Sequence, residues 1–229
     1  MTHFLSFLSL FLLLSCGSKT PQVLEPKPKP DTLRIKYLAL GDSYTKGQSV
    51  PLSQSFPYQL QDTLQKNPLT KVSVQVIAQT GWTTQNLLDA IANANIHEEY
   101  DLVTLLIGVN NQYQNKPISL YEQQFPALVD KAIQLAGGDT SKVLIISIPD
   151  YAYTPFGQGN PNISEGIDTY NMLNQQFAQQ YGIQYVNITD ISRQGLAQPS
   201  LVATDGLHPS GKMYSLWVER IAKAVATIF

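Results

Sequence analysis

Apolar residues follow two alternating patterns along the chain. Short apolar runs, typical of β-strands, alternate with longer stretches. In the longer stretches, apolar residues recur every three or four positions, as on one face of a helix. The strand-like segments are residues 33–40, 71–79, 100–108, 142–149 and 183–189. The helix-like segments are residues 56–66, 83–94, 119–138, 165–182 and 210–229. Five predicted strands therefore alternate with five predicted helices.

Several predicted strands are apolar throughout, such as YDLVTLLIG at 100–108. Such strands are expected where helices cover both faces of a sheet. Their alternation with helices predicts a parallel, doubly wound, flavodoxin-like sheet of five strands in an α/β/α sandwich. Ser119 and Glu122 have the spacing of a capping box at the start of the third long helix. Sites in sheets of this kind form at the carboxyl ends of the strands.

The first 31 residues differ from the rest of the chain. Phe4 to Leu14 form an uncharged apolar run, which is shorter than the ~20 residues that span a bilayer and suits a signal peptide. Residues 17–31 are rich in Pro and Lys, a composition that favours an extended tether. The expected organisation is a signal peptide at 1–15, a tether at 16–31 and one folded domain at 32–229.

Cys16 is the single cysteine, so the chain forms no internal disulfide. The stretch LLSC at 13–16 resembles the lipobox of bacterial lipoproteins. This resemblance implies cleavage before Cys16 and lipidation of its sulfur and of the new amino terminus. The residues that follow, Gly17 and Ser18, resemble those of an outer-membrane lipoprotein. The expectation is a protein held in the cell envelope by a lipid anchor, on the outer membrane or facing the periplasm.

Composition narrows the classes of function. The formal net charge is −2 and no run of Lys or Arg is present, so we expect no nucleic-acid partner. No cluster of Cys and His has the spacing of a metal site, and no glycine-rich phosphate-binding motif follows a strand. We therefore expect neither a metal nor another cofactor. The oligomeric state is left open.

A serine stands directly after the first predicted strand, in LALGDSYTKG at 38–47. Gly41, Asp42 and Ser43 are turn-forming residue types, and the need for a turn is enough to explain them. The alternative is that the turn presents Ser43 as a nucleophile. A serine nucleophile requires a base, a group that orients the base, and donors for the oxyanion.

Among the three histidines, His208 is the candidate for the base. His3 lies in the predicted signal peptide, and His97 lies at a polar helix end where a surface position is expected. His208 follows Asp205 by three residues in TDGLHPSG. One turn can therefore carry both groups, with the carboxylate on one imidazole nitrogen and the other nitrogen free for a serine. A polar turn before the last helix is the alternative.

Two more candidates follow strands. Gly81 stands in AQTGWTT after the second strand, and Asn110 stands in LIGVNN after the third. Each alone is a common turn residue. Because the carboxyl ends of parallel strands share one edge of the sheet, Ser43, Gly81 and Asn110 are expected to converge there.

These segments together resemble the SGNH/GDSL hydrolase family. GDSY carries the nucleophile block, with Tyr44 where Leu is often found, while TGWT, GVNN and DGLHP match the three blocks that follow. The resemblance covers residues 33–229 and implies the SGNH hydrolase fold and a carboxylic ester hydrolase. Asp42 is expected to hold the turn. The G-x-S-x-G elbow of α/β-hydrolases is absent, because Thr45 stands where its last Gly would be.

The resemblance also implies a role for each matching residue. Ser43 attacks the acyl carbon, His208 acts as general base and then as general acid, and Asp205 orients His208. The oxyanion is bound by the backbone amides of Ser43 and Gly81 and by the side-chain amide of Asn110.

The substrate is less defined. Trp82 and Tyr151 are expected to line the substrate site, and the loop 150–161 with Tyr151, Tyr153 and Phe156 either forms an apolar wall or packs onto the domain. The prediction is a serine esterase of the lysophospholipase or acylesterase type, with a small-molecule or lipid acyl ester as substrate. A carbohydrate acetylesterase and a non-catalytic binding module on the same fold are the alternatives.

Overall fold

The structure is a computed structural model that describes Met1 and residues 32–94, 96 and 99–229. The strands are β1 (Leu33–Gly41), β2 (Thr70–Ala78), β3 (Leu102–Leu106), β4 (Val143–Ile146) and β5 (Gln184–Val186). The long helices are α2 (Phe56–Leu64), α3 (Thr84–Asn93), α5 (Ile118–Leu135), α6 (Pro161–Tyr181) and α8 (Gly211–Val225). Each of the ten predicted elements is therefore present.

Short helices occupy the connections between the long elements. The α-helical ones are α1 (Ser43–Lys46), α4 (Val109–Tyr113) and α7 (Thr189–Ser192). The 3₁₀ ones are η1 (Leu52–Gln54), η2 (Thr140–Lys142), η3 (Tyr151–Tyr153) and η4 (Pro199–Leu201). The periodicity of the sequence does not reveal these helices, because each is shorter than the stretch over which an apolar face can be recognised.

The five strands form one parallel sheet in the order β2-β1-β3-β4-β5. This is the flavodoxin-like order, which confirms the predicted doubly wound fold. Gly41 at the end of β1 lies opposite Ala78 of β2 and Leu106 of β3. The chain reverses its direction of travel across the sheet between β1 and β3, and the connections there leave a crevice at the carboxyl ends of the strands.

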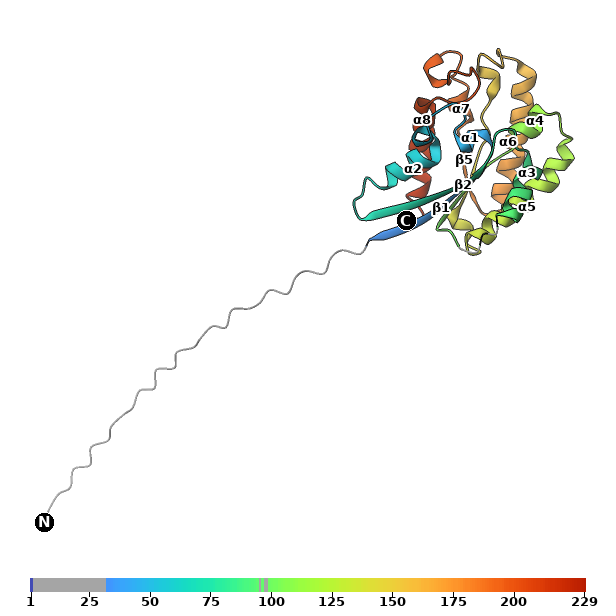
Figure 1. Ribbon diagram of the computed structural model, residues 1–229. Coiled ribbons are helices and arrows are strands. Elements are labelled where there is room, and N and C mark those ends of the chain that lie inside the picture. The colour runs from blue at the N-terminus through green and yellow to red at the C-terminus, as the bar shows by residue number, and fades with distance from the viewer. Residues whose placement is uncertain (2–31, 95, 97–98) are drawn as a thin grey trace. The chain divides into compact units, whose positions relative to one another are not determined.

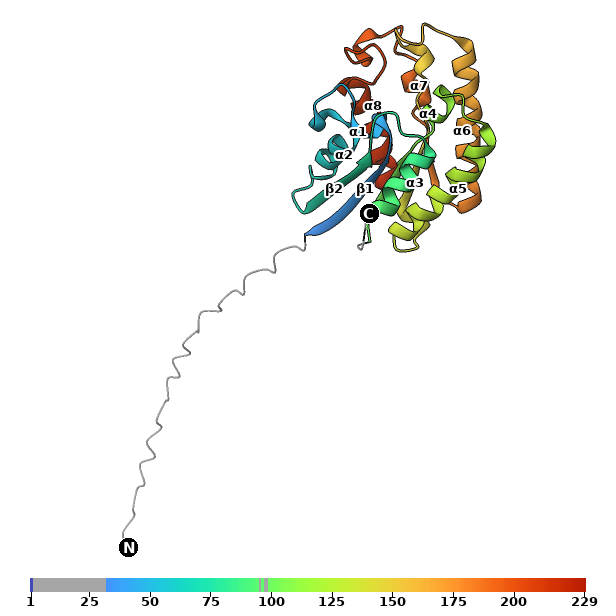
Figure 2. The same ribbon diagram turned by 45° about the vertical axis from the view of Figure 1, so that its right-hand side comes forward.

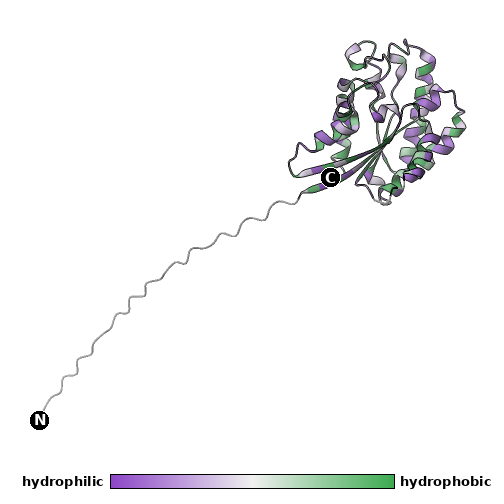
Figure 3. Ribbon diagram, in the orientation of Figure 1, coloured by the Kyte–Doolittle hydropathy of each residue, from purple (hydrophilic) through white to green (hydrophobic). Residues whose placement is uncertain are grey.

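Helices cover both faces of the sheet. α2 packs with α8 on one face, while α3, α5 and α6 form the other layer (Figures 1 and 2). Every residue of β3 and β4 is buried, as expected for strands between two helical layers. The helices alternate hydrophilic and hydrophobic residues along their length (Figure 3), which is the amphipathic pattern that packing on one side requires.

The predicted capping box at Ser119 and Glu122 is wrong. α5 begins at Ile118, its N-cap is Pro117, and no side chain caps it. The proline ring holds φ at −54°, and the N-cap lies two positions before Ser119. A capping box does form in α3, where Thr83 and Asn86 exchange hydrogen bonds with each other's backbone.

Candidate active site

Four of the predicted site residues meet at the carboxyl edge of the sheet. Ser43 follows β1, Gly81 follows β2, Asn110 lies in α4 after β3, and His208 lies in the loop before α8. All four line one cavity of about 250 Å³. The structure therefore brings together groups that are up to 165 positions apart, counted from Ser43 to His208.

The turn that carries Ser43 depends on Gly41. A Cβ atom at Gly41 would lie 2.1 Å from Thr45 Oγ1 and 2.4 Å from the carbonyl oxygen of Leu106. Both distances are far below van der Waals contact, so only glycine fits. The chain can then turn sharply out of the sheet, and Ser43 becomes the first residue of α1 at the edge of the cavity.

Asp42 is the N-cap of α1 and is completely buried. Its Oδ1 accepts from the backbone N–H of Tyr44 at 3.0 Å, and its Oδ2 lies 3.5 Å from Asn110 Nδ2. Burial raises the pKa of Asp42 to about 7, although these hydrogen bonds act to lower it. The cap leaves the N–H of Ser43 without an acceptor among the described residues, as is usual in a first helical turn.

The Asp205–His208 pair has the geometry of a base and its orienting group. His208 Nδ1 lies 2.6 Å from Asp205 Oδ2, and Oδ1 accepts from the backbone N–H groups of Leu207 and His208 at 3.0 Å. Ser49 Oγ donates to Oδ2 at 2.6 Å. Partial burial acts to raise the pKa of Asp205, but these hydrogen bonds outweigh it and hold the pKa well below its usual range.

The ionised Asp205 determines the tautomer of His208. A carboxylate only accepts hydrogen bonds, so Nδ1 of the imidazole must carry the proton that lies between the two groups. In the neutral ring, Nε2 is then free of a proton and can act as a base. The ring is held from one side by Tyr44, whose ring centroid is 5.2 Å away.

Ser43, the predicted nucleophile, is not hydrogen-bonded to His208, the predicted base, in this structure. Both Ser43 and His208 line the cavity, yet among the described residues no hydrogen bond within 3.5 Å joins Ser43 Oγ to the imidazole. Such bonds are often long in free enzymes and shorten in the complex with substrate. The alignment of the two groups therefore depends on the contacts that hold each of them.

The predicted oxyanion donors are held by hydrogen bonds of their own. Gly81 has a φ of +84°, a conformation that favours glycine, and its carbonyl accepts from Gln114 Nε2 at 3.2 Å. Asn110 Nδ2 donates one proton to the carbonyl of Trp82 at 3.0 Å. Since the amide carries two protons, the second remains for a ligand, apart from the long contact to Asp42.

Trp82 differs from the expectation for it. Its side chain is not among those that line the cavity, and it packs instead against the hydrophobic core. The reason is that the turn after Gly81 directs the backbone carbonyl of Trp82, rather than its ring, to Asn110. Trp82 thus contacts the site through its main chain.

Three aromatic rings form one wall of the cavity. Tyr113, Tyr151 and Phe156 lie with their ring centroids 6.0 to 6.3 Å apart in each pair, and all three line the cavity. Tyr151 is buried, whereas Tyr113 and Phe156 are about half exposed. Of the two alternatives for loop 150–161, Tyr151 and Phe156 thus line the wall, and Tyr153 is not among the lining residues.

The sequence analysis assigned no role to the remaining lining residues. Tyr44, Thr80, Val109 and Leu207 stand within the segments GDSY, TGWT, GVNN and DGLHP, and they complete the lining together with Tyr113. Tyr113 follows Asn110 by three positions on α4, so the helical period is the signal that places both on one side of that helix. Ser49 has no such signal, because its contact with Asp205 joins residues 156 positions apart.

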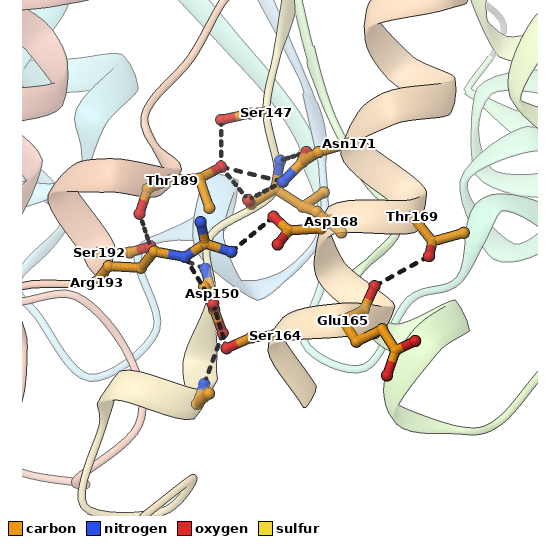
Figure 4. Close-up of polar contacts among 12 residues, drawn as sticks. Ser147, Asp150, Ser164, Glu165, Asp168, Thr169, Asn171, Thr189, Ser192 and Arg193 are labelled. Carbon is orange, nitrogen blue, oxygen red and sulfur yellow. Dashed lines mark hydrogen bonds and ion pairs between the residues drawn. The ribbon is translucent and has the colours of Figure 1, made fainter. Parts of the chain in front are cut away.

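A polar network around the buried Asp150 supports the loop that carries Tyr151. The carboxylate of Asp150 accepts from the N–H of Ala152 at 3.0 Å, from Ser164 Oγ at 2.7 Å and from Arg193 Nε at 2.9 Å (Figure 4). Arg193 also reaches Asp168 at 2.6 Å. Asp150 is therefore engaged with Arg193 on the side of α6 and α7 rather than with the imidazole of the site.

Two predictions from the sequence concern a metal site and the lipidation of Cys16. In the part of the chain that the structure describes, no three side chains of His, Cys, Asp or Glu gather as a metal site would need. Cys16, the predicted lipidation residue, lies outside the described residues, as do the predicted signal peptide beyond Met1 and the whole of the predicted tether.

Comparison with known proteins gives matches over most of the chain. The profile of the GDSL-like Lipase/Acylhydrolase family matches residues 39–216. The uncharacterized protein YpmR of Bacillus subtilis (strain 168) is 23% identical, over 95% of this chain and 93% of that protein.

Solved structures share the fold at low sequence identity. A variant of Axe2, an acetyl xylan esterase from Geobacillus stearothermophilus, matches with a TM-score of 0.67 at 18% identity, over 85% of this chain and 96% of that one. The structure of TesA matches with a TM-score of 0.68 at 18% identity, over 85% of this chain and 99% of that one.

Proposed function

This chain belongs to the GDSL-like lipase/acylhydrolase family, and from that premise we propose that it is a serine hydrolase of carboxylic esters. The observation that carries the proposal is the shared cavity: Ser43, Gly81, Asn110 and His208 line it together, and Asp205 lies 2.6 Å behind the imidazole. A nucleophile, a base with its orienting group, and oxyanion donors around one cavity are the set that acyl transfer requires.

In the proposed reaction, Ser43 Oγ attacks the acyl carbon while His208 Nε2 takes its proton. The tetrahedral oxyanion is bound by the N–H groups of Ser43 and Gly81 and by the amide of Asn110. Its collapse expels the alcohol, which leaves with the proton from His208, and Ser43 remains acylated. Water then attacks the acyl-serine, again with His208 as base, and releases the acid. Asp205 stays ionised throughout and stabilises the imidazolium.

The side chains that line the cavity favour a substrate with an apolar acyl group. Six of the lining side chains are apolar or aromatic, and about 250 Å³ corresponds to roughly eight water-sized groups. An acyl chain of intermediate length would fill this volume, whereas an acetyl group would leave most of it empty. We therefore place the protein with acylesterases and lysophospholipases. The alternative is a carbohydrate acetylesterase, for which the shared fold with Axe2 is the support.

A panel of esters tests the proposal. The purified full-length chain in detergent is assayed on aryl esters of graded acyl length, a lysophospholipid, an acyl thioester and an acetylated xylo-oligosaccharide, beside Ser43→Ala. We expect the highest kcat/KM at intermediate length, a loss of several orders of magnitude in the variant, and phosphonate labelling of the parent alone. Turnover confined to acetyl esters would favour the acetylesterase. No turnover and no labelling would leave the non-catalytic binding module.

We also propose that the domain is held in the cell envelope by a lipid on Cys16. The support is the lipobox-like LLSC at 13–16 after an apolar run, followed by the Pro/Lys-rich tether. Within the described residues, no helix has both the length and the apolar character that crossing a bilayer needs. The lipid on Cys16 is the proposed link to the membrane.

A further inference from the structure

We infer that Gln48 and Ser49 form a positioning clamp. The clamp joins the segment that follows Ser43 to the Asp205 turn and to the segment that carries Gly81. Ser49 holds the carboxylate of Asp205, and Gln48 holds Thr80 beside the oxyanion glycine. The clamp acts through these groups and touches no reacting atom, and its role rests on the proposed serine hydrolase function.

The clamp is fixed to the nucleophile residue itself. Gly47 is the C-cap of α1 and has a left-handed φ of 81°. The backbone N–H groups of Gly47 and Gln48 both donate to the carbonyl oxygen of Ser43, each at 3.0 Å. These two bonds fix Gly47 and Gln48 relative to Ser43, and Ser49 follows Gln48 directly in the chain.

Ser49 is the one partner of the Asp205 carboxylate from outside its own turn, among the described residues. The other three donors come from Leu207 and His208, two and three positions away. Those local bonds keep the turn rigid but do not place it against Ser43. The bond from Ser49 Oγ at 2.6 Å has the length of a charge-assisted O–H···O⁻ bond, and it joins the turn to the nucleophile segment.

The backbone of Ser49 supports this role. Its φ is +67°, a left-handed conformation that non-glycine residues seldom adopt. Such conformations persist where surrounding contacts enforce them and are frequent at functional sites. Here the left-handed conformation brings the hydroxyl of Ser49 to Asp205, while the side chain of Gln48 reaches Thr80.

Gln48 makes the second connection. Its Oε1 accepts from Thr80 Oγ1 at 2.7 Å. Thr80 lines the cavity and directly precedes Gly81, whose N–H is a proposed oxyanion donor. Adjacent residues of one turn thus reach the glycine segment on one side and the Asp205 turn on the other.

The clamp matters because Ser43 and His208 lie on separate segments of the chain. No hydrogen bond links Ser43 Oγ to His208 in the described residues, so the distance between nucleophile and base follows from how their segments are held. Backbone bonds contribute, such as that from Phe156 N–H to the carbonyl of Gly206 at 2.9 Å. Among the described residues, Ser49 is the one group from outside the Asp205 turn that holds the carboxylate. Errors near 1 Å in such sites lower rates by about a hundredfold.

Kinetics of Ser49 variants test the first half of the clamp. Ser49→Ala and Ser49→Gly both remove the hydroxyl, but glycine also relieves the left-handed strain. We expect both to lower kcat about tenfold with KM changed less than about twofold. Ser49→Asn, which tolerates this φ and offers an N–H donor, should recover part of the loss. In an Asp205→Asn background, Ser49→Ala should cause no further loss.

Gln48→Leu tests the second half. It should lower kcat severalfold, and its effect should disappear in a Thr80→Val background, since both remove the same bond. Ser53→Ala, an exposed position of η1, is the control and should match the parent. Thermal unfolding of each variant establishes that it is folded.

Several outcomes overturn the clamp. Parental kcat in Ser49→Ala, recovery of kcat in Ser49→Gly, or additive effects of the Ser49 and Asp205 changes would each show that the hydroxyl does not position the carboxylate. Additive effects of Gln48→Leu and Thr80→Val would do the same for the glycine segment. Failure of the proposed function looks different: the parent itself would be inactive, or Ser43→Ala would keep its activity.

Discussion

At the scale of single residues, the site contains two carboxyl groups whose pKa values are shifted in opposite directions. Burial raises the pKa of Asp42 to about 7. For Asp205 burial also acts upward, but the hydrogen bonds from Ser49, the backbone and the imidazole prevail and lower the pKa. The carboxyl group that caps the helix is therefore mostly protonated below about pH 7, while the other is ionised beside His208.

The shift at Asp42 makes stability depend on pH. The native group keeps its proton up to about pH 7, whereas the unfolded chain loses it near the ordinary value of 3.8. Protonation therefore favours the native state at acid pH, and this contribution, as much as about 4 kcal/mol, is lost as pH rises from about 4 to 7. Asp42→Asn keeps a cap and should remove this decline.

Urea unfolding at a series of pH values between 4 and 8 measures the effect. The free energy of unfolding of the parent should fall more steeply over this range than that of Asp42→Asn. Asp62→Asn, an exposed change on α2, serves as the control and should follow the parent. Equal slopes for the parent and Asp42→Asn would show that the buried carboxyl does not hold its proton as stated.

Asn110 provides a second prediction at this scale. The oxyanion forms only along the reaction path, so Asn110→Ala should lower kcat while KM changes little. The expected loss is about a hundred- to a thousandfold, as for other oxyanion donors. Steady-state kinetics on the preferred ester of the panel measures it. A change confined to KM would assign Asn110 to binding of the ground state.

At the scale of elements, the aromatic wall joins α4 to the loop after β4. Tyr113 comes from α4, Tyr151 from η3 and Phe156 from the segment beyond it. The polar network of Asp150 and Arg193 holds this loop to α6 and α7 (Figure 4). Substrate selection is therefore expected to depend on how these elements meet.

Phe156→Ala tests the wall. Its ring is half exposed, so its removal should leave folding intact and take apolar contact from longer acyl chains. We expect kcat/KM to fall about tenfold for esters of intermediate length, since each buried CH₂ contributes about 0.8 kcal/mol, and to change little for acetyl esters. Leu69→Ala, exposed before β2 at the opposite edge, is the control. Equal losses for all acyl lengths would assign Phe156 to general support.

At the scale of the whole molecule, the folded domain and its proposed anchor are separate parts of one chain. A lipidated Cys16 would carry at least two acyl chains in a bacterial lipoprotein, and two chains hold a protein stably where one does not. The parent should therefore fractionate with membranes and enter the detergent phase, while Cys16→Ser should not. Mass spectrometry of the mature amino terminus decides the matter, and an unmodified Cys16 or a retained Met1 would contradict the anchor.

The sequence by itself determined the order and type of the long elements, and with them the parallel doubly wound sheet. It did so because the period of apolar residues is local, and because fully apolar strands require two helical layers. The same local signals single out Ser43, Gly81, Asn110 and the Asp205–His208 turn, since each lies just after a strand or just before the last helix. Parallel topology then places these ends at one edge.

Only the tertiary structure decided how these groups are held. The bonds from Ser49 to Asp205 and from Thr80 to Gln48, and the aromatic wall of Tyr113 and Phe156, join segments far apart in the chain. The ring of Trp82 packs against the core, which is also a contact that the local sequence does not predict. Such contacts form where packed elements bring side chains within a few ångströms of each other. A local sequence pattern does not predict which distant side chains come that close.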